Sequence, residues 1–107
     1  MAATFFHNIT TVLTKDLLSA GDNVSNLNSI TIANVDSTND AKVDLFLNKD
    51  DDNFYILKNV PVPLGSTLVL GPEDNIAFNN SASGYSMRIQ VDDGSTTAVA
   101  VDVILKR

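Results

Sequence analysis

The sequence predicts an all-β protein, a single antiparallel β-sandwich that is small and barrel-like, with about eight short strands. Three observations favour this class. Apolar and polar residues alternate with period two in one segment after another. Aspartate and asparagine, which favour turns, each occur 12 times among the 107 residues. No segment carries an apolar stripe at helical spacing over three turns.

Length and composition indicate one domain, residues 1–107, with an ordinary apolar share of 44%. The net charge of −6 and only seven scattered basic residues argue against nucleic-acid binding. The chain has no cysteine, so disulfides and thiolate zinc sites are excluded. Its start, "MAATFFHNITTVL", lacks a basic region followed by a long apolar run. We therefore expect neither a signal peptide nor a membrane span, and synthesis in a cytosol.

The first half of the chain contains several predicted strands. Residues 4–18 mix β-branched and aromatic residues and form one or two strands, although 14–21 could hold one helical turn closed by a glycine. Residues 28–35 and 42–48 alternate and are predicted to pair through the turn at 36–40. Their inward side chains, Ile30 and Ile32 against Val43, Leu45 and Leu47, face each other across the core.

The middle of the chain combines turns with a stiff, proline-containing segment. Residues 49–53 form a turn that leads into 54–58. Prolines cannot donate ladder hydrogen bonds, so "NVPVP" at 59–63 must be an edge strand or an extended crossing. Gly65 and Ser66 then turn the chain into a strand at 67–70, which Pro72 ends. Residues 75–79 are one more short strand.

Residues 85–106, near the end of the chain, give the sharpest prediction. "YSMRIQV" and "TTAVAVDVILK" alternate, and "VDDGST" between them resembles a hairpin turn in which Gly94 supplies a positive φ. We predict an antiparallel hairpin of these two strands. The inward side chains are Tyr85, Met87, Ile89 and Val91 on the first strand and Val99, Val101, Val103 and Leu105 on the second.

Candidate catalytic and metal sites are few. A serine nucleophile or a metalloprotease centre needs a histidine beside partners, and His7 is the one histidine. We predict no enzyme, no catalytic residue and no cofactor. Asp50–Asp52 and Asp92–Asp93 offer oxygen ligands to calcium, but neither has the ligand spacing of an EF-hand. We interpret both as solvated turns, with a cation at Asp50–Asp52 left as an alternative.

Several segments, in order, resemble small virion structural proteins of tailed bacteriophages, particularly those of marine cyanobacterial phages. They are "HNITTVL", "SITIANV", "VDLFL", "YILKNVPVPLGSTLVL" and "NIAFNN", which span most of the chain. In that group an "-AN-" or "-SN-" step and an alternating strand precede a segment of pattern K-[NDG]-x-x-[IV]-P-x-G-x-[ST]-L. The matching residues here are Lys58, Asn59, Pro63, Gly65, Ser66, Thr67 and Leu68. The chain departs from the group at Glu73 and Asp74, where a glycine and an aspartate are usual.

The resemblance implies a non-enzymatic β-sandwich in the phage particle. The first expectation is a homo-oligomeric capsid decoration or cement subunit, and the alternative is a neck, tail or baseplate component. Its partners would be further copies and other virion proteins, either the major capsid protein or tail and neck proteins. Neither nucleic acid nor membrane is expected, and the location is the virion, after synthesis in the host cytoplasm.

Candidate interface residues come from two segments. "TFF" near the start places rings on both faces of a terminal strand, so one face must find cover, from the core or from a neighbouring subunit. The proline segment is expected to present apolar side chains at a sheet edge. The predicted interface residues are Phe5, Phe6, Val60, Val62 and Leu64.

A function of another class is a carbohydrate-binding module, which sandwiches also serve. Sugar sites use exposed aromatic platforms. The chain has no tryptophan and two tyrosines, Tyr55 and Tyr85, of which Tyr85 is predicted to point inward. Composition therefore favours the structural role over sugar binding.

Overall fold

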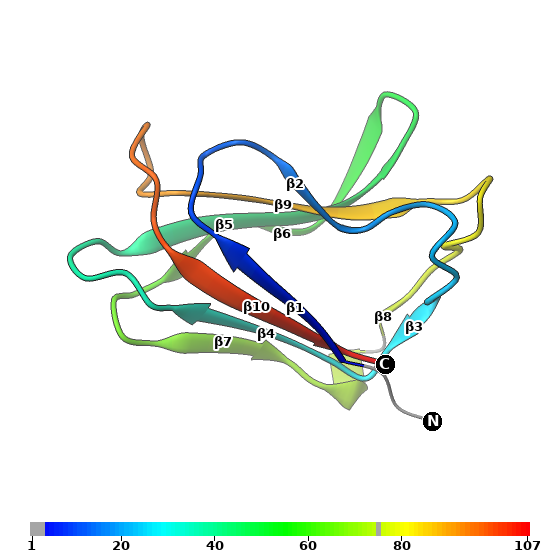
Figure 1. Ribbon diagram of the computed structural model, residues 1–107, viewed down its shortest axis with the longest axis horizontal. Coiled ribbons are helices and arrows are strands. Elements are labelled where there is room, and N and C mark those ends of the chain that lie inside the picture. The colour runs from blue at the N-terminus through cyan, green and yellow to red at the C-terminus, as the bar shows by residue number, and fades with distance from the viewer. Residues whose placement is uncertain (1–3, 75) are drawn as a thin grey trace.

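A computed structural model describes residues 4–74 and 76–107, which form two antiparallel four-stranded sheets and one short two-stranded sheet (Figure 1). Sheet A has the strand order β1-β10-β4-β7, sheet B has β2-β9-β5-β6, and β3 pairs with β8. The predicted all-β antiparallel sandwich is confirmed. The elements are β1 (Thr4–Ile9), β2 (Lys15–Leu18), β3 (Asn26–Leu27), β4 (Ser29–Asn34), β5 (Ala41–Lys49), β6 (Asp52–Val62), β7 (Thr67–Leu70), the 3-10 helix η1 (Pro72–Asp74), β8 (Ile76–Ala77), β9 (Ser86–Asp92) and β10 (Val101–Lys106).

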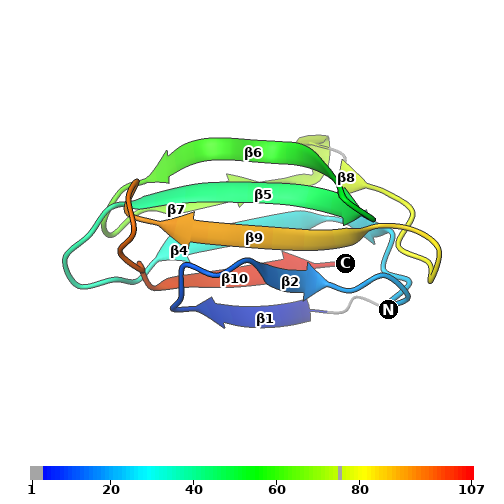
Figure 2. The ribbon, with the colours of Figure 1, turned by 90° about the horizontal axis from the view of Figure 1, so that it is seen from above.

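The order of the eight long strands is that of a jelly roll. Along the chain they belong to sheets A, B, A, B, B, A, B and A, so most connections pass from one sheet to the other. Figure 2 shows four such crossings at one end of the sandwich: β1–β2, β4–β5, β6–β7 and β9–β10. Within the two large sheets, β5 and β6 are the one pair of consecutive strands that are hydrogen-bonded to each other.

The core lies between the two sheets and is built mainly from alternate residues of the strands. Burial of a valine, leucine or isoleucine side chain contributes about 1.5–3 kcal/mol, so this layer dominates stability. The predicted inward positions of the last two long strands are confirmed, except that Tyr85, just before β9, is half-buried. Fully buried members include Ile30, Ile32, Val43, Leu45, Met87, Ile89, Val91, Val101, Val103 and Leu105.

The predicted hairpin over residues 85–106 is wrong. β9 pairs with β2 and β5 in sheet B, whereas β10 lies between β1 and β4 in sheet A. Gly94 does have a positive φ of 93°, but the loop that contains it, residues 93–100, runs across to the opposite sheet, and Val99 of this loop is buried. Alternation determines which side of a strand faces the core but not the sheet to which the strand belongs. β9 and β10 both point their apolar side chains into the core, from the two opposite sheets.

The predicted pairing of 28–35 with 42–48 is wrong for the same reason. β4 belongs to sheet A and β5 to sheet B, so the turn at 36–40 is a crossing between sheets. Their inward side chains nevertheless belong to one core, as predicted, with Leu47 partly buried at its margin.

The possible helical turn at 14–21 is a strand instead. β2 pairs with β9, and a bulge between Asp16 and Leu18 allows the consecutive residues Leu17 and Leu18 both to be buried. The Arg88 guanidinium on β9 donates to the Asp16 carboxylate at 2.7 Å and reinforces this pairing. No helix in the described ranges is long and apolar enough to cross a bilayer.

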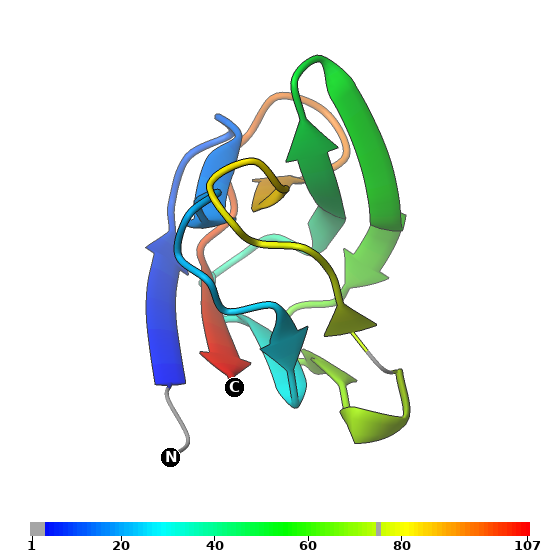
Figure 3. The same cartoon turned by 90° about the vertical axis from the view of Figure 1, so that its right-hand side faces the viewer.

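The end of the sandwich opposite the four crossings is closed by the two short strands. Figure 3 faces this end, with β3 and β8 toward the viewer. Val24 and Leu27 are buried here, and Asn80 is completely buried among the loops. The Asn80 side chain accepts from the Val24 amide at 2.9 Å and donates to the carbonyls of Ser19 and Tyr85 at 3.1 and 2.8 Å. One side chain thus joins the loop after β2 to the loop before β9.

Candidate interaction surfaces

The proline segment is an edge strand that becomes a crossing, as its sequence predicted. β6 lies at the edge of sheet B as far as Val62, and the chain then turns at Pro63–Ser66 into β7 at the edge of sheet A. The Ser66 amide donates to the Pro63 carbonyl at 2.9 Å, and Gly65 has a φ of 76°. The segment is therefore an edge strand as far as Val62 and a crossing from Pro63 onward, so each of the two predicted alternatives holds for one part of it.

The predicted interface at this segment is wrong for Val62. Its side chain is 1% exposed and belongs to the core, because β6 still alternates there and presents Val62 inward. Val60 is half-buried, and Leu64, in the crossing, is 44% exposed. The segment is also tied to its own subunit, because the Asn34 side chain donates to the Val62 carbonyl at 3.0 Å and the Leu64 amide donates to Asp40 at 2.8 Å.

The two predicted phenylalanines of β1 point in opposite directions, as alternation requires. Phe5 is half-buried and packs against the core, so its cover comes from its own subunit. Phe6 points away from the core and is 72% exposed. β1 lies at the edge of sheet A and pairs along its whole length with β10.

The outer surface of sheet A, here called the A face, has a row of three apolar side chains and one threonine across its middle, called the apolar row below. Phe6 pairs with Ile104, Ile104 with Thr31, and Thr31 with Val69, so the four residues follow one another across the four strands. Val69 is 58% exposed, and Ile104 and Thr31 are half-buried. A shallow depression of about 390 Å³ lies beside Phe6, Asn8, Asp102 and Ile104.

The A face is almost free of charge. The four strands of sheet A contain one acid and one base, Asp102 and Lys106, and both lie on β10. The four strands of sheet B differ, because charged residues occur on each of them. Those residues are Lys15, Asp16, Lys42, Asp44, Lys49, Asp52, Lys58, Arg88 and Asp92.

Sheet B instead carries aromatic side chains where the β5–β6 hairpin projects beyond the body of the sandwich (Figure 1). Tyr55 packs on Phe46 with ring centroids 5.0 Å apart, and the Lys58 ammonium lies 4.6 Å from the Tyr55 ring centroid. Phe54, which is 53% exposed, meets Tyr85 edge to face at 5.9 Å. The hairpin therefore exposes aromatic rings at one corner of the molecule.

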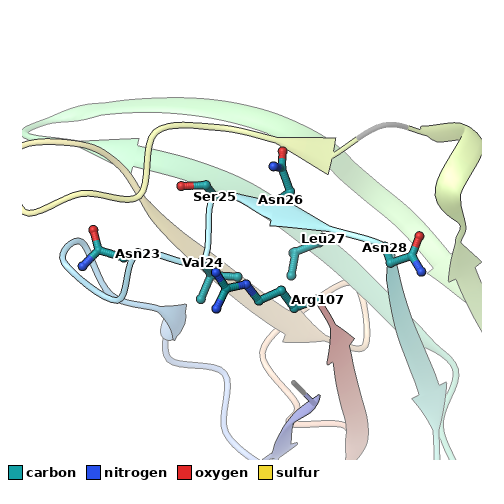
Figure 4. A pocket seen from close by; sticks show the side chains of 7 residues that line it. All are labelled: Asn23, Val24, Ser25, Asn26, Leu27, Asn28 and Arg107. Carbon is teal, nitrogen blue, oxygen red and sulfur yellow. The ribbon is translucent and has the colours of Figure 1, made fainter. Parts of the chain in front are cut away.

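Further hollows in the described part of the chain lie outside the A face. Beside the hairpin, a polar pocket of about 300 Å³ is lined in part by Asp16, Asn48, Asp50 and Arg88. At the closed end, a pocket of about 330 Å³ is lined by Asn23, Val24, Ser25, Asn26, Leu27, Asn28 and Arg107. Figure 4 shows the carboxamides of Asn26 and Asn28 directed away from the Arg107 guanidinium. The polar groups of this second pocket do not converge on one ligand position.

The acidic runs lie in turns only in part: Asp50 and Asp51 form the turn between β5 and β6 and Asp93 lies in the loop after β9, whereas Asp52 begins β6 and Asp92 ends β9. Asp50, with a φ of 57°, begins the exposed turn between β5 and β6. The Asp92 carboxylate accepts from the Gly94 amide at 2.8 Å, and that of Asp93 accepts from Ser95 and Thr97. No group of three or more histidine, cysteine, aspartate or glutamate side chains suited to a metal occurs in the described part of the chain. His7 lies half-buried on β1, opposite Val103.

The Asp36 carboxylate has a lowered pKa, and its role is to connect loops. Asp36, in the β4–β5 crossing, accepts from the backbone amides of Ala100, Thr38 and Asn39 at 3.2, 3.2 and 3.0 Å. These hydrogen bonds, that from Ala100 first, lower the pKa of Asp36 below its ordinary value of 3.8. The ionised carboxylate thereby ties the β4–β5 crossing to the β9–β10 crossing.

Sequence reasoning identified Phe6 but missed the other members of the apolar row. Ile104, Thr31 and Val69 lie on three other strands, and only the strand order brings them beside Phe6. A signal was nevertheless present, because residues 4–9, 29–34 and 67–70 contain no charged residue on either face of a predicted strand. No protein-family model and no curated protein matches this chain.

Proposed function

We propose that this chain is a non-enzymatic structural protein of a tailed-phage virion, a homo-oligomeric capsid decoration subunit that binds and stabilises the particle. The observation that carries the proposal is the jelly-roll strand order, since jelly rolls are a common architecture of viral capsid domains. The resemblance of "YILKNVPVPLGSTLVL" and its flanking strands to small virion proteins supports it independently. A neck, tail or baseplate position in the virion is the alternative location within this proposal.

The surfaces fit a protein that works through contacts. Hydrogen bonds of side chains such as Asn34 and Asp36 connect its crossings to neighbouring strands and loops. The A face combines exposed apolar side chains with little charge, which is typical of the centre of a protein interface. Neighbours that bind only the folded subunit would add to its stability.

Mass spectrometry of purified virions tests this proposal. Particles of a phage that encodes the chain are separated into heads and tails, and each fraction is quantified against the major capsid protein. A copy number comparable with that of the major capsid protein in the head fraction supports capsid decoration. Enrichment in the tail fraction supports a neck, tail or baseplate position. Absence from both fractions contradicts the proposal.

A second candidate function, carbohydrate binding, is favoured by the aromatic side chains of the β5–β6 hairpin. Lectin domains also use jelly rolls, and sugars stack on exposed rings such as Phe54 and Tyr55. The adjoining pocket offers carboxylates and an amide, from Asp16, Asp50 and Asn48, to sugar hydroxyls. Binding on a glycan array that is lost in Tyr55→Ala, and retained in the control Phe6→Ala, would favour this function.

A further inference from the structure

We infer that the A face is a self-association surface, on which a second copy of the chain packs about a twofold axis that runs along the apolar row. A twofold interface brings the same patch of both copies together, so the patch must complement itself. The A face meets this condition both in its apolar row and in its charges. The inference concerns the isolated protein and holds whether or not the virion proposal does.

The apolar row supplies the centre of the contact. An axis along the row places Phe6 against Phe6 of the second copy, Ile104 against Ile104 and Val69 against Val69. Stacked sheets lie about 10 Å apart, which side chains of this size fill from both sides. Phe6 and Val69, exposed in one copy, would be covered by the other.

The two charges of the A face complement each other about the same axis. Asp102 and Lys106 lie on β10, two residues to either side of Ile104. Rotation by half a turn about the row therefore brings Asp102 of each copy over Lys106 of the other, which makes two opposite-charge pairs. The Asn8 side chain donates to the Asp102 carboxylate at 2.7 Å and holds it on this face. Sheet B differs in carrying charged residues on all four of its strands.

The size of the A face sets the strength of the contact. Four strands about 4.8 Å apart and six residues of about 3.3 Å each give a face of roughly 400 Å² per copy. A standard stable interface uses about 800 Å² per partner. We therefore expect a weak dimer, with a Kd on the order of 10–100 μM, whose formation depends on both the apolar row and the charge pairs.

Sedimentation velocity of the purified chain between about 5 μM and about 1 mM tests the apolar row. The wild type should shift from monomer to dimer over this range. Phe6→Lys places two ammonium groups together on the axis and should remain monomeric, and so should Val69→Lys. The matched control Phe54→Lys changes an exposed aromatic of sheet B and should dimerise like the wild type. A wild type that is monomeric throughout, or a Phe6→Lys variant that dimerises normally, overturns the inference.

A charge exchange tests the axis itself. Asp102→Lys alone and Lys106→Asp alone each place like charges together in both pairs, and each should raise the dimer Kd about tenfold or more. The double variant restores opposite charges and should return to within about threefold of the wild type. If dimerisation occurred instead by pairing of the β1 edges, Kd would not respond to these changes. That result, or a double variant as weak as the single variants, contradicts the proposed axis.

Discussion

At the scale of the residue, two asparagines hold the loops of the sandwich. Asn34, at the crossing end, bonds to backbone groups of the β4–β5 loop and of β6. Asn80, at the closed end, bonds to backbone groups of the loop after β2 and to Tyr85 in its own loop. Every buried side-chain polar atom in the described residues has a hydrogen-bond partner. Asparagine suits this use because one amide both donates and accepts.

Replacement of Asn80 by alanine should destabilise the protein by about 3 kcal/mol. The change leaves the Val24 amide and the carbonyls of Ser19 and Tyr85 without their partner. Urea denaturation followed by circular dichroism measures the loss. Asn53→Ala, at an exposed position, is the control and should cost about 0.5 kcal/mol or less. Equal losses in both variants would contradict the role given to Asn80.

Asp36 should make stability depend on pH in the acidic range. Its pKa is lower in the folded chain than in the unfolded chain, so the ionised carboxylate favours folding. This contribution is complete well above pH 3.8 and is lost as the pH falls below 3.8 through the lowered pKa. Asp36→Asn should therefore have a lower Tm than the wild type at pH 7, and the difference should shrink below about pH 4.

Thermal melts from pH 7 to pH 3 check this expectation. Asp51→Asn makes the same change in net charge in the exposed β5–β6 turn and serves as the control. A Tm difference between Asp36→Asn and the wild type that stays constant as the pH falls would show that the carboxylate charge is not what joins the crossings.

At the scale of the element, alternation predicted the buried faces of β4, β5, β9 and β10 but not how the proline segment ends. Val60, Val62 and Leu64 are all apolar and occupy alternate positions. Only the structure shows that Val62 is the last inward residue of β6 and that Leu64 already lies in the crossing. The difference arises from tertiary context, since the Asn34 side chain fixes the Val62 carbonyl from the neighbouring sheet.

Val62→Ala and Leu64→Ala should therefore differ sharply. The first removes two methyl groups from a buried site and should cost about 2 kcal/mol in unfolding free energy. The second trims a partly exposed side chain and should cost about 0.5 kcal/mol or less. Urea midpoints of the two variants make the comparison. A Leu64→Ala variant that is as unstable as Val62→Ala would indicate that the Leu64 side chain is part of the core, which contradicts this prediction.

At the scale of the whole molecule, the sequence predicted the layers and not the strand order. Met87, Ile89 and Val91 and their counterparts on β10 are buried as expected, yet the two strands lie in different sheets. A half-buried strand has the same pattern wherever it lies in a sheet, so alternation cannot choose its neighbours. The A face was missed for this reason, since its apolar row exists only in the assembled order.

A pair of introduced cysteines tests the strand order, because the chain has none of its own. Thr31 and Ile104 are direct partners on β4 and β10, and antiparallel partners have Cα atoms about 4.5–5.5 Å apart, within disulfide reach. Thr31→Cys with Ile104→Cys should form an intramolecular disulfide on oxidation, detected by intact mass. Gln90→Cys with Ile104→Cys joins opposite outer faces and should not. The reverse result would contradict the jelly-roll order.

The insertion of β10 between β1 and β4 governs how the chain can fold. Thr4 pairs with Lys106 across nearly the whole length of the chain, so loop-closure entropy opposes this contact until much of the molecule is in place. The β5–β6 hairpin, which needs no distant segment, is the natural place for folding to begin. During synthesis, β1 and β4 must wait with unpaired edges until Val101–Lys106 emerges from the ribosome. In a nascent or truncated chain that lacks β10, Ile30 and Ile32 of β4 lose the neighbouring strand beside which they are buried. We expect such a chain to be prone to aggregation until β10 has inserted between β1 and β4.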